Sequence, residues 1–250
     1  MPFFNKIRKN EIKTGGIKRY LLYAIGEIVL VVVGILIALQ VNEWETNRYS
    51  RMKELKYLNA IKQDLKIDLK RLSELIAFRK LKQEGNTQIL KNIDGEPIGS
   101  LTSFTKIVMN SVMEETFSPN NITYTEMVSS GNLNVIRNDS IRLTLLELET
   151  LYKANRFMID HETFDYREYI SKPFFRLIPI SKLLPVFAGQ KTAEEQLIKI
   201  KDFNSLLKSQ EYRNGIYVLS ITGMSVVKNY ENTISKSKQL IGLIEKESQK

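Results

Sequence analysis

The longest apolar stretch of the chain lies near its N-terminus, from Tyr20 to Val41, and has the sequence YLLYAIGEIVLVVVGILIALQV. No polar side chain interrupts it between Ile28 and Leu39. A helix of about 22 residues rises about 33 Å, which is enough to cross a hydrocarbon core of about 30 Å. The pattern therefore predicts a transmembrane helix over residues 20–41.

A cleaved signal peptide is the alternative interpretation, because it also combines a basic start with an apolar run. The end of this run, Ala38-Leu39-Gln40-Val41, contains no small-x-small cleavage site. The run is also long for the apolar region of a signal peptide. We therefore interpret it as a span that is not removed.

Beyond the span, apolar residues recur every three or four positions, which is the period of an amphipathic helix. No segment alternates with period two for six residues or more, so strands are not expected. We predict an all-α fold in which one N-terminal transmembrane helix continues into an antiparallel helical bundle. The helices are expected at residues 43–82, 86–93, 101–115, 141–171, 192–209 and 210–248. The expected buried stripe of the 141–171 helix consists of Ile141, Leu145, Leu148 and Tyr152.

Several local signals predict where these helices begin and end. Gly85-Asn86 indicates a turn, and the three prolines of residues 173–191 indicate a loop that starts at Pro173. Thr123 with Glu126 fits a capping box. Asp139 or Ser140 would cap the helix that follows. Ser129, Ser130 and Gly131 are expected to form a structural turn at the end of a helix, with Gly131 in the left-handed conformation.

Positive charge is concentrated before the span. The net charge of the chain is +9, and residues 1–19 carry six basic side chains and one acid. A basic segment next to an apolar run indicates an anionic membrane surface and not nucleic acid. Basic residues that flank a span favour the cytoplasmic side, and aromatic rings favour the interfaces. The expected membrane-interface anchors are Lys18, Arg19, Tyr20 and Trp44.

These observations predict three parts: a basic cytoplasmic tail (1–19), the transmembrane helix (20–41) and an extracytoplasmic helical-bundle domain (42–250). The expected location is the cell inner membrane, crossed once, with the N-terminus in the cytoplasm and the C-terminal domain in the periplasm. The lipid bilayer is the first expected partner.

One face of the span contains small residues and an acid. The predicted helix-packing positions follow one another at steps of three and four: Ala24, Glu27, Val31, Gly34 and Ala38. Small residues let helix backbones approach closely, so this face suits a protein partner or self-association. Two other interpretations of Glu27 stay open. It reaches the interface or is neutral, or it takes part in ion or proton coupling.

The composition excludes several kinds of site. With no Cys and one His, the chain offers no thiolate and no pair of imidazoles for a metal. No glycine-rich phosphate loop or nucleophile motif occurs, and Asp64, Asp68 and Glu74 suit solvated helix faces. We therefore expect no catalytic, cofactor-binding or metal residues, no cofactor, no nucleic-acid binding and no enzyme activity.

Two stretches resemble an uncharacterised family of bacterial single-span membrane proteins. One is YLLYAIGEIVLVVVGILIALQVNEWE, with NKIRKN upstream, and the other is TYTEMVSSGNLNVIRNDSIR. The resemblance implies a membrane location and a helical outer domain. It implies no known activity, so no catalytic residue is transferred from it.

Together these patterns support the hypothesis of a membrane-anchored interaction or accessory module of an envelope assembly. The alternative is an extracytoplasmic ligand-sensing module that signals through its single span to a separate output protein.

Overall fold

The computed structural model describes residues 17–249, with side chains from residue 21 onward. Most of the predicted basic tail lies outside these residues. The chain divides into two units, Met1–Lys56 and Tyr57–Lys250. Both are helical, and residues 17–249 contain no strand. The prediction of an all-α fold is confirmed.

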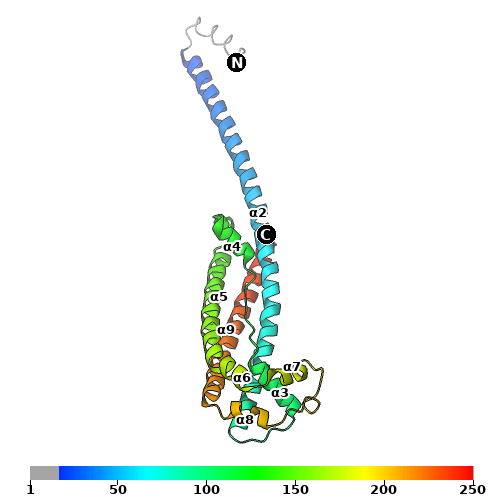
Figure 1. The fold of residues 1–250 in the computed structure, drawn as a ribbon. Coiled ribbons are helices and arrows are strands. Elements are labelled where there is room, and N and C mark those ends of the chain that lie inside the picture. Colours follow the sequence, from blue (N-terminus) through cyan, green and yellow to red (C-terminus); the bar gives the residue numbers. More distant parts are fainter. Residues whose placement is uncertain (1–16, 250) are drawn as a thin grey trace. The chain divides into compact units, whose positions relative to one another are not determined.

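The described part of the first unit consists of the start of helix α2 (Ile17–Ile93) (Figure 1). From Leu21 to Val41 its apolar side chains are exposed, except that of Ala24, which is partly exposed, and none of the residues in its most apolar stretch is buried. By length and composition this helix can cross a membrane. Leaving so much apolar surface in water is unfavourable at about 25 cal/mol per Å².

The second unit is built on three long helices: α2 from Tyr57 onward, α5 (Asp139–Tyr166) and α9 (Gln210–Ser248) (Figure 1). Ion pairs of Lys62 with Glu245 and of Lys80 with Glu231 show that α9 runs antiparallel to α2. Asp68 of α2 bonds to Tyr152 of α5, and further along both helices Arg79 bonds to Glu162, so these two helices run parallel. The long first and last helices therefore pack as the sequence predicts.

Apolar residues at helical spacing form the core of this three-helix bundle. On α5 the predicted stripe is buried: Ile141, Leu145, Leu148 and Tyr152 are at most 8% exposed. It packs against Leu58, Ile61 and Leu65 of α2 and against Leu240 and Ile244 of α9. Burial of each such side chain contributes about 1.5–3 kcal/mol to folding.

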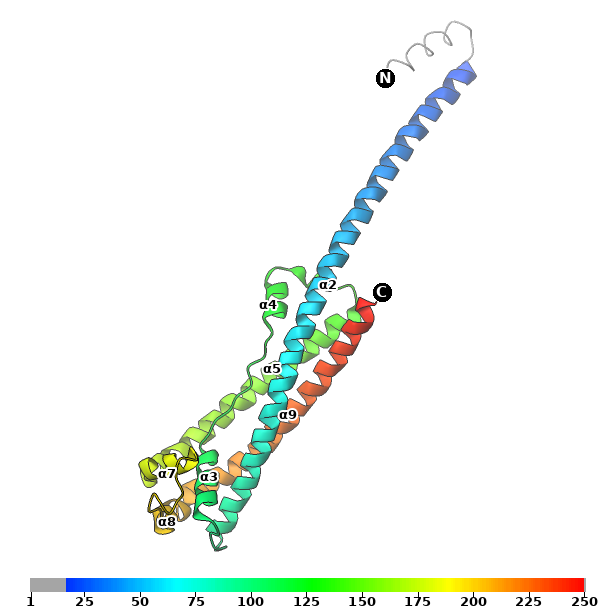
Figure 2. The ribbon, with the colours of Figure 1, turned by 90° about the vertical axis from the view of Figure 1, so that its right-hand side faces the viewer.

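Short helices form a small lobe at one end of the bundle (Figures 1 and 2). They are α3 (Leu101–Ser111), α6 (Lys172–Leu177), α7 (Ile180–Phe187) and α8 (Lys201–Leu207). The rings of Phe104 and Phe203 meet edge to face with centroids 5.0 Å apart, which joins α3 to α8. Helix α4 (Ile122–Ser129) lies outside this lobe, beside the first half of α5.

Two predicted helix breaks are wrong. Helix α2 continues through Gly85, where a β-carbon would come within 3.2 Å of Ile107 of α3. Here glycine permits close helix packing and does not form a turn. Pro173 also does not end its helix, because the π-helical segment Arg167–Ser171 leads into α6, which has the proline in its first turn.

The predicted loop and caps need correction too. Residues 173–191 contain α6 and α7, and of residues 192–209 only α8 is helical. A positive φ of 54° at Leu197 interrupts the helix predicted there. Asn138, and neither Asp139 nor Ser140, caps α5, since its Oδ1 accepts hydrogen bonds from two backbone N–H groups.

An extended segment connects α3 to α4. Residues 113–121 have no helical structure and run along the bundle beside α2 and α5 (Figure 2). We call these nine residues the strap. Its Phe117 is partly buried and packs against the core, with its ring centroid 5.9 Å from those of Tyr152 of α5 and Tyr230 of α9. The strap thus occupies the groove between the long helices.

The contact between α9 and the π-helical segment yields a stability prediction. A β-carbon at Gly215 would lie 2.7 Å from the backbone oxygen of Tyr169, so Gly215→Ala is expected to lower the free energy of unfolding by about 1–3 kcal/mol. Gly242, on the same helix, has no atom within 4 Å of that position. Gly242→Ala should therefore raise the stability by about 0.5–1 kcal/mol. Urea unfolding of the full chain in detergent measures both, and equal effects would contradict the close contact.

Candidate functional site

The predicted helix-packing face of the span lies on α2. Glu27, Val31, Gly34 and Ala38 are exposed, and Ala24 is partly exposed. A β-carbon added at Gly34 would have no neighbouring atom within 4 Å. These residues share one side of the helix, but no other described segment of unit 1 packs against them. Their role in helix packing stays a prediction.

The interface anchors and the turn are placed as follows. Lys18, Arg19 and Tyr20 belong to α2, but their side chains lie outside the described residues. The Trp44 side chain is exposed, with the Arg48 guanidinium 5.8 Å from its ring centroid. Helix α4 ends at Ser129, Ser130 is its C-cap, and Gly131 has a φ of 67°. Only glycine adopts this left-handed conformation without strain.

A polar cluster that the sequence did not indicate anchors one end of the strap. Asp68 of α2 accepts a hydrogen bond from the Asn120 backbone N–H at 2.8 Å and another from the Tyr152 hydroxyl at 2.9 Å. One turn earlier, Asp64 accepts bonds from the Asn120 amide at 3.0 Å and the Thr123 hydroxyl at 2.6 Å. Two carboxylates thus join α2 to the strap, α4 and α5.

These contacts correct two sequence interpretations. Asp68 is 2% exposed and does not belong to a solvated helix face. Burial raises the pKa of the Asp68 carboxyl above its usual value, and the neighbouring charge of Asp64 adds to this, although the hydrogen bonds from Asn120 and Tyr152 oppose it. Thr123 does not form a capping box, because α4 begins at Ile122 and the Thr123 hydroxyl is bonded to Asp64.

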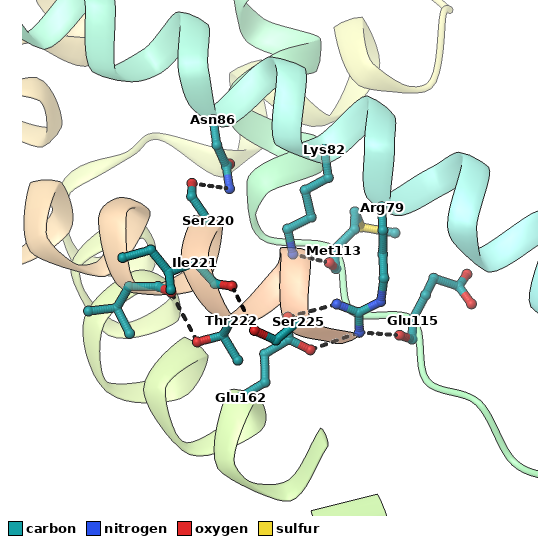
Figure 3. A network of polar contacts seen from close by, with 11 residues as sticks. Arg79, Lys82, Asn86, Met113, Glu115, Glu162, Ser220, Ile221, Thr222 and Ser225 are labelled. Atoms are coloured by element: carbon teal, nitrogen blue, oxygen red, sulfur yellow. Dashed lines mark hydrogen bonds and ion pairs between the residues drawn. The ribbon is translucent and has the colours of Figure 1, made fainter. Parts of the chain in front are cut away.

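A buried ion pair anchors the strap further along α2 (Figure 3). The Arg79 guanidinium donates two hydrogen bonds of 2.7 Å to the Glu162 carboxylate of α5, and one of 3.3 Å to the Glu115 backbone oxygen. Only 9% of the Arg79 side chain is exposed. Burial lowers the pKa of Arg79. The hydrogen bonds to Glu162 and its charge outweigh this effect and raise the pKa above its ordinary value. Because both charges are desolvated, removing either partner is expected to be strongly destabilising.

Lys82 lies one turn beyond Arg79 and completes this anchor (Figure 3). Its Nζ donates to the Met113 backbone oxygen at 2.8 Å and lies 5.4 Å from the centroid of the Tyr166 ring. Burial lowers the pKa of Lys82 to about 8, and the Arg79 charge adds to this effect. The charge of Glu162 opposes it. The amine is therefore partly neutral near pH 8.

A small cavity lies beside the acidic anchor. It has a volume of about 20 Å³, and its walls contain apolar side chains of α2 and α5 together with Asp64, Glu149, Asn120, Asn121 and Tyr124. The Glu149 Oε2 atom is buried and has no hydrogen-bond partner among the described residues. A buried acceptor without a donor costs about 1–3 kcal/mol. We take this cavity and the adjoining strap as the candidate site.

The candidate site offers hydrogen-bonding side chains next to an apolar wall. Within residues 17–249, no group of three or more His, Asp or Glu side chains could hold a metal ion. His161, the one histidine, is largely exposed and lies 3.2 Å from Asp165, away from the cavity lining. The carboxylates of Asp64 and Asp68 instead accept hydrogen bonds from Asn120 of the strap.

The residues of this site were missed because their signal is not local. Asp64 and Asp68 follow the same spacing as solvated acids on any helix, and Glu149 lies among other charged residues of α5. What distinguishes them is the strap that covers them, and its path depends on contacts 52 to 84 residues apart in the chain. The uncharged sequence FSPNN, residues 117–121, with its proline, was the available hint of an extended segment.

Comparison with known proteins gives a family and no activity. A family model described as "Family of unknown function (DUF6090)" matches residues 27–172, which is more than half of the chain, and the chain belongs to this family. The matched region contains most of the apolar stretch of α2, the strap and α5. No curated protein and no solved structure matches the chain.

Burial of Asp68 yields a prediction about pH. Its pKa is higher in the folded chain than in the unfolded chain, so its contribution to stability is fully present below the unfolded value and is lost as the pH rises through the folded value. Asp68→Asn removes this titration, while its side chain can still accept from the Asn120 N–H. The stability of the variant relative to the original chain should therefore increase as the pH rises above the ordinary Asp value of 3.8.

Urea unfolding of both chains at several pH values measures this difference. Glu74→Gln, an exposed change on the same helix, is the matched control and should give a nearly constant difference. A relative stability of Asp68→Asn that decreases with rising pH would show that the carboxylate is stabilised by folding, contrary to its burial.

Proposed function

We propose that this member of the DUF6090 family is a single-span, membrane-anchored helical module that acts by docking a protein partner and not by catalysis. The apolar stretch of α2 serves as the anchor, since it is long enough to cross a bilayer and all its side chains are available to lipid. The basic residues before it support a cytoplasmic N-terminus, with unit 2 in the periplasm. Lys18, Arg19, Tyr20 and Trp44 would lie at the two interfaces.

The observation that carries the docking proposal is an apolar stripe on the outer face of α5. It consists of Leu143, Leu146, Phe157 and Phe164, which are 47–73% exposed. Together with Thr150, Lys153 and Asp160, these residues follow one another at steps of three and four along the helix. Large apolar side chains that share one exposed helix face mark interaction surfaces. A partner helix with an apolar face and acidic and basic flanks suits this stripe.

The span offers a second contact for an envelope assembly. Glu27 shares its helix face with Gly34 and Ala38, so a partner span or the span of a second copy can approach closely there. A carboxylate is costly in the bilayer interior, and a partner helix that donates a hydrogen bond to Glu27 would relieve this cost. In this proposal, one docking face lies on the span within the membrane and the other lies on α5.

Ligand sensing is a second candidate function, favoured by the cavity beside the strap. The cavity touches α2, α5 and the strap at once. A ligand held there would therefore bias how the strap lies on the helix that leads to the span. The output would have to come from a separate protein.

The membrane part of the proposal is tested by topology. Alkaline phosphatase and a fluorescent protein are fused in turn after Lys250. We expect active phosphatase and no fluorescence, because both reporters would lie in the periplasm. The control is the same pair of fusions on a chain without residues 20–41, where phosphatase should be inactive. Fluorescence with inactive phosphatase from the full chain would reverse the proposed orientation.

The docking surface is tested by photo-crosslinking in intact membranes. A photoreactive residue replaces Phe157 or Phe164, and the control replaces Ser235, an exposed residue on α9 away from the stripe. We expect a discrete adduct from the two stripe positions and none from Ser235. An adduct of twice the mass of the chain would identify the partner as a second copy. Equal labelling at all three positions, or no adduct, would overturn the proposal.

A further inference from the structure

A second small cavity lies at the other end of the strap, between α2 and α5. It has a volume of about 20 Å³, and its lining combines Lys82 of α2, Tyr166 of α5 and the strap residues 113–116. Lys82 is partly exposed, and the hydrogen bond from its Nζ to the Met113 backbone oxygen is open to solvent. A small solute can therefore reach the amine from outside.

Lys82 differs from its basic neighbours because it has no carboxylate partner. Arg79 and Lys80 each pair with a glutamate of a neighbouring helix. Lys82 forms no ion pair within the described part of the chain. Its amine bonds to the Met113 carbonyl and lies 5.4 Å from the centroid of the Tyr166 ring (Figure 3). A desolvated ammonium without a carboxylate beside it is disfavoured relative to the neutral amine.

The surroundings of the amine keep part of it neutral at ordinary pH. Burial lowers the pKa of Lys82 to about 8, the charges of Glu162 and Glu114 oppose this shift, and that of Arg79 adds to it. At pH 7.5 about a quarter of such an amine is neutral, against about one in a thousand for an ordinary lysine. Desolvation and a neighbouring cation are the features that turn a lysine into a nucleophile for carbonyl groups.

We propose that Lys82 is a covalent binding site for a small aldehyde, which it holds as an imine. The lone pair of Nζ attacks the carbonyl carbon, a C–N bond forms, and the carbonyl oxygen takes up a proton that the nitrogen gives up. This oxygen then leaves as water, so one amine and one aldehyde give one imine and one water, with no oxidation or reduction. The size of the cavity restricts the aldehyde to a short carbon chain.

The adduct would change how the strap is held. A neutral imine nitrogen has no hydrogen to donate, so the bond to the Met113 oxygen is lost when the imine forms. The inference goes beyond the proposed docking and does not depend on it, because no residue of the α5 stripe belongs to the lining of this cavity.

The test is reductive alkylation of the full chain in detergent micelles, with limiting acetaldehyde and sodium cyanoborohydride at pH 7.5 in an amine-free buffer. The reductant converts each imine to a stable ethylamine, and peptide mass spectrometry gives the rate at each lysine. We expect Lys82 to react at least about tenfold faster than Lys80, which is exposed on the same helix. The ratio is smaller than that of the neutral fractions, because a weaker base is a weaker nucleophile. A rate at Lys82 that does not exceed that at Lys80 would overturn the proposal.

Two controls show whether the folded site causes the difference. In guanidinium chloride the cavity is lost, so both lysines should react at the same rate, and a persistent preference for Lys82 would count against the site. Glu114→Gln removes an exposed strap acid whose charge favours the ammonium form. This variant should accelerate the reaction of Lys82 and leave that of Lys80 unchanged, whereas a slower reaction of Lys82 would contradict the role of the neutral amine.

Discussion

The bundle depends on how α2 satisfies the polar groups of an extended peptide. Three long helices leave a groove between α2 and α5, and the strap that fills it has no helix or sheet to bond its own backbone. Where water does not reach such a backbone, its N–H and C=O groups need other partners, and side chains supply some of them. Asp68, Arg79 and Lys82 supply them to Asn120, Glu115 and Met113. The acid and the bases lie on one face of the same helix, and each is spaced to meet the strap.

This arrangement concentrates charge in the interior. The Arg79–Glu162 pair and Asp68 are largely desolvated, and their hydrogen bonds also hold the strap and α5 in place. Apolar side chains of the same size would pack well but would leave the strap backbone unsatisfied. The polar residues therefore specify the path of the strap more than they add to the stability of the bundle.

The sequence predicted what depends on periodicity and missed what depends on the strap. The all-α class, the α9 helix from Gln210 to Ser248 and the buried stripe from Ile141 to Tyr152 follow from three- and four-residue spacing. Gly85 and Pro173 misled, because both are tolerated where a neighbouring helix or a π-helical segment accommodates them. Burial of Asp68 could not be predicted, since nothing near it in the chain indicates the segment that covers it.

The length of the strap has a consequence of its own. From the Lys82 contact at Met113 to the Asp68 contact at Asn120, seven residues reach at most about 25 Å when fully extended. The fourteen residues of α2 between the same two anchors rise about 21 Å. The peptide is therefore almost taut, and its residue count is matched to the helix beneath it. A one-residue deletion would lower the greatest reach of the strap to about 22 Å, which leaves almost no slack between the two anchors.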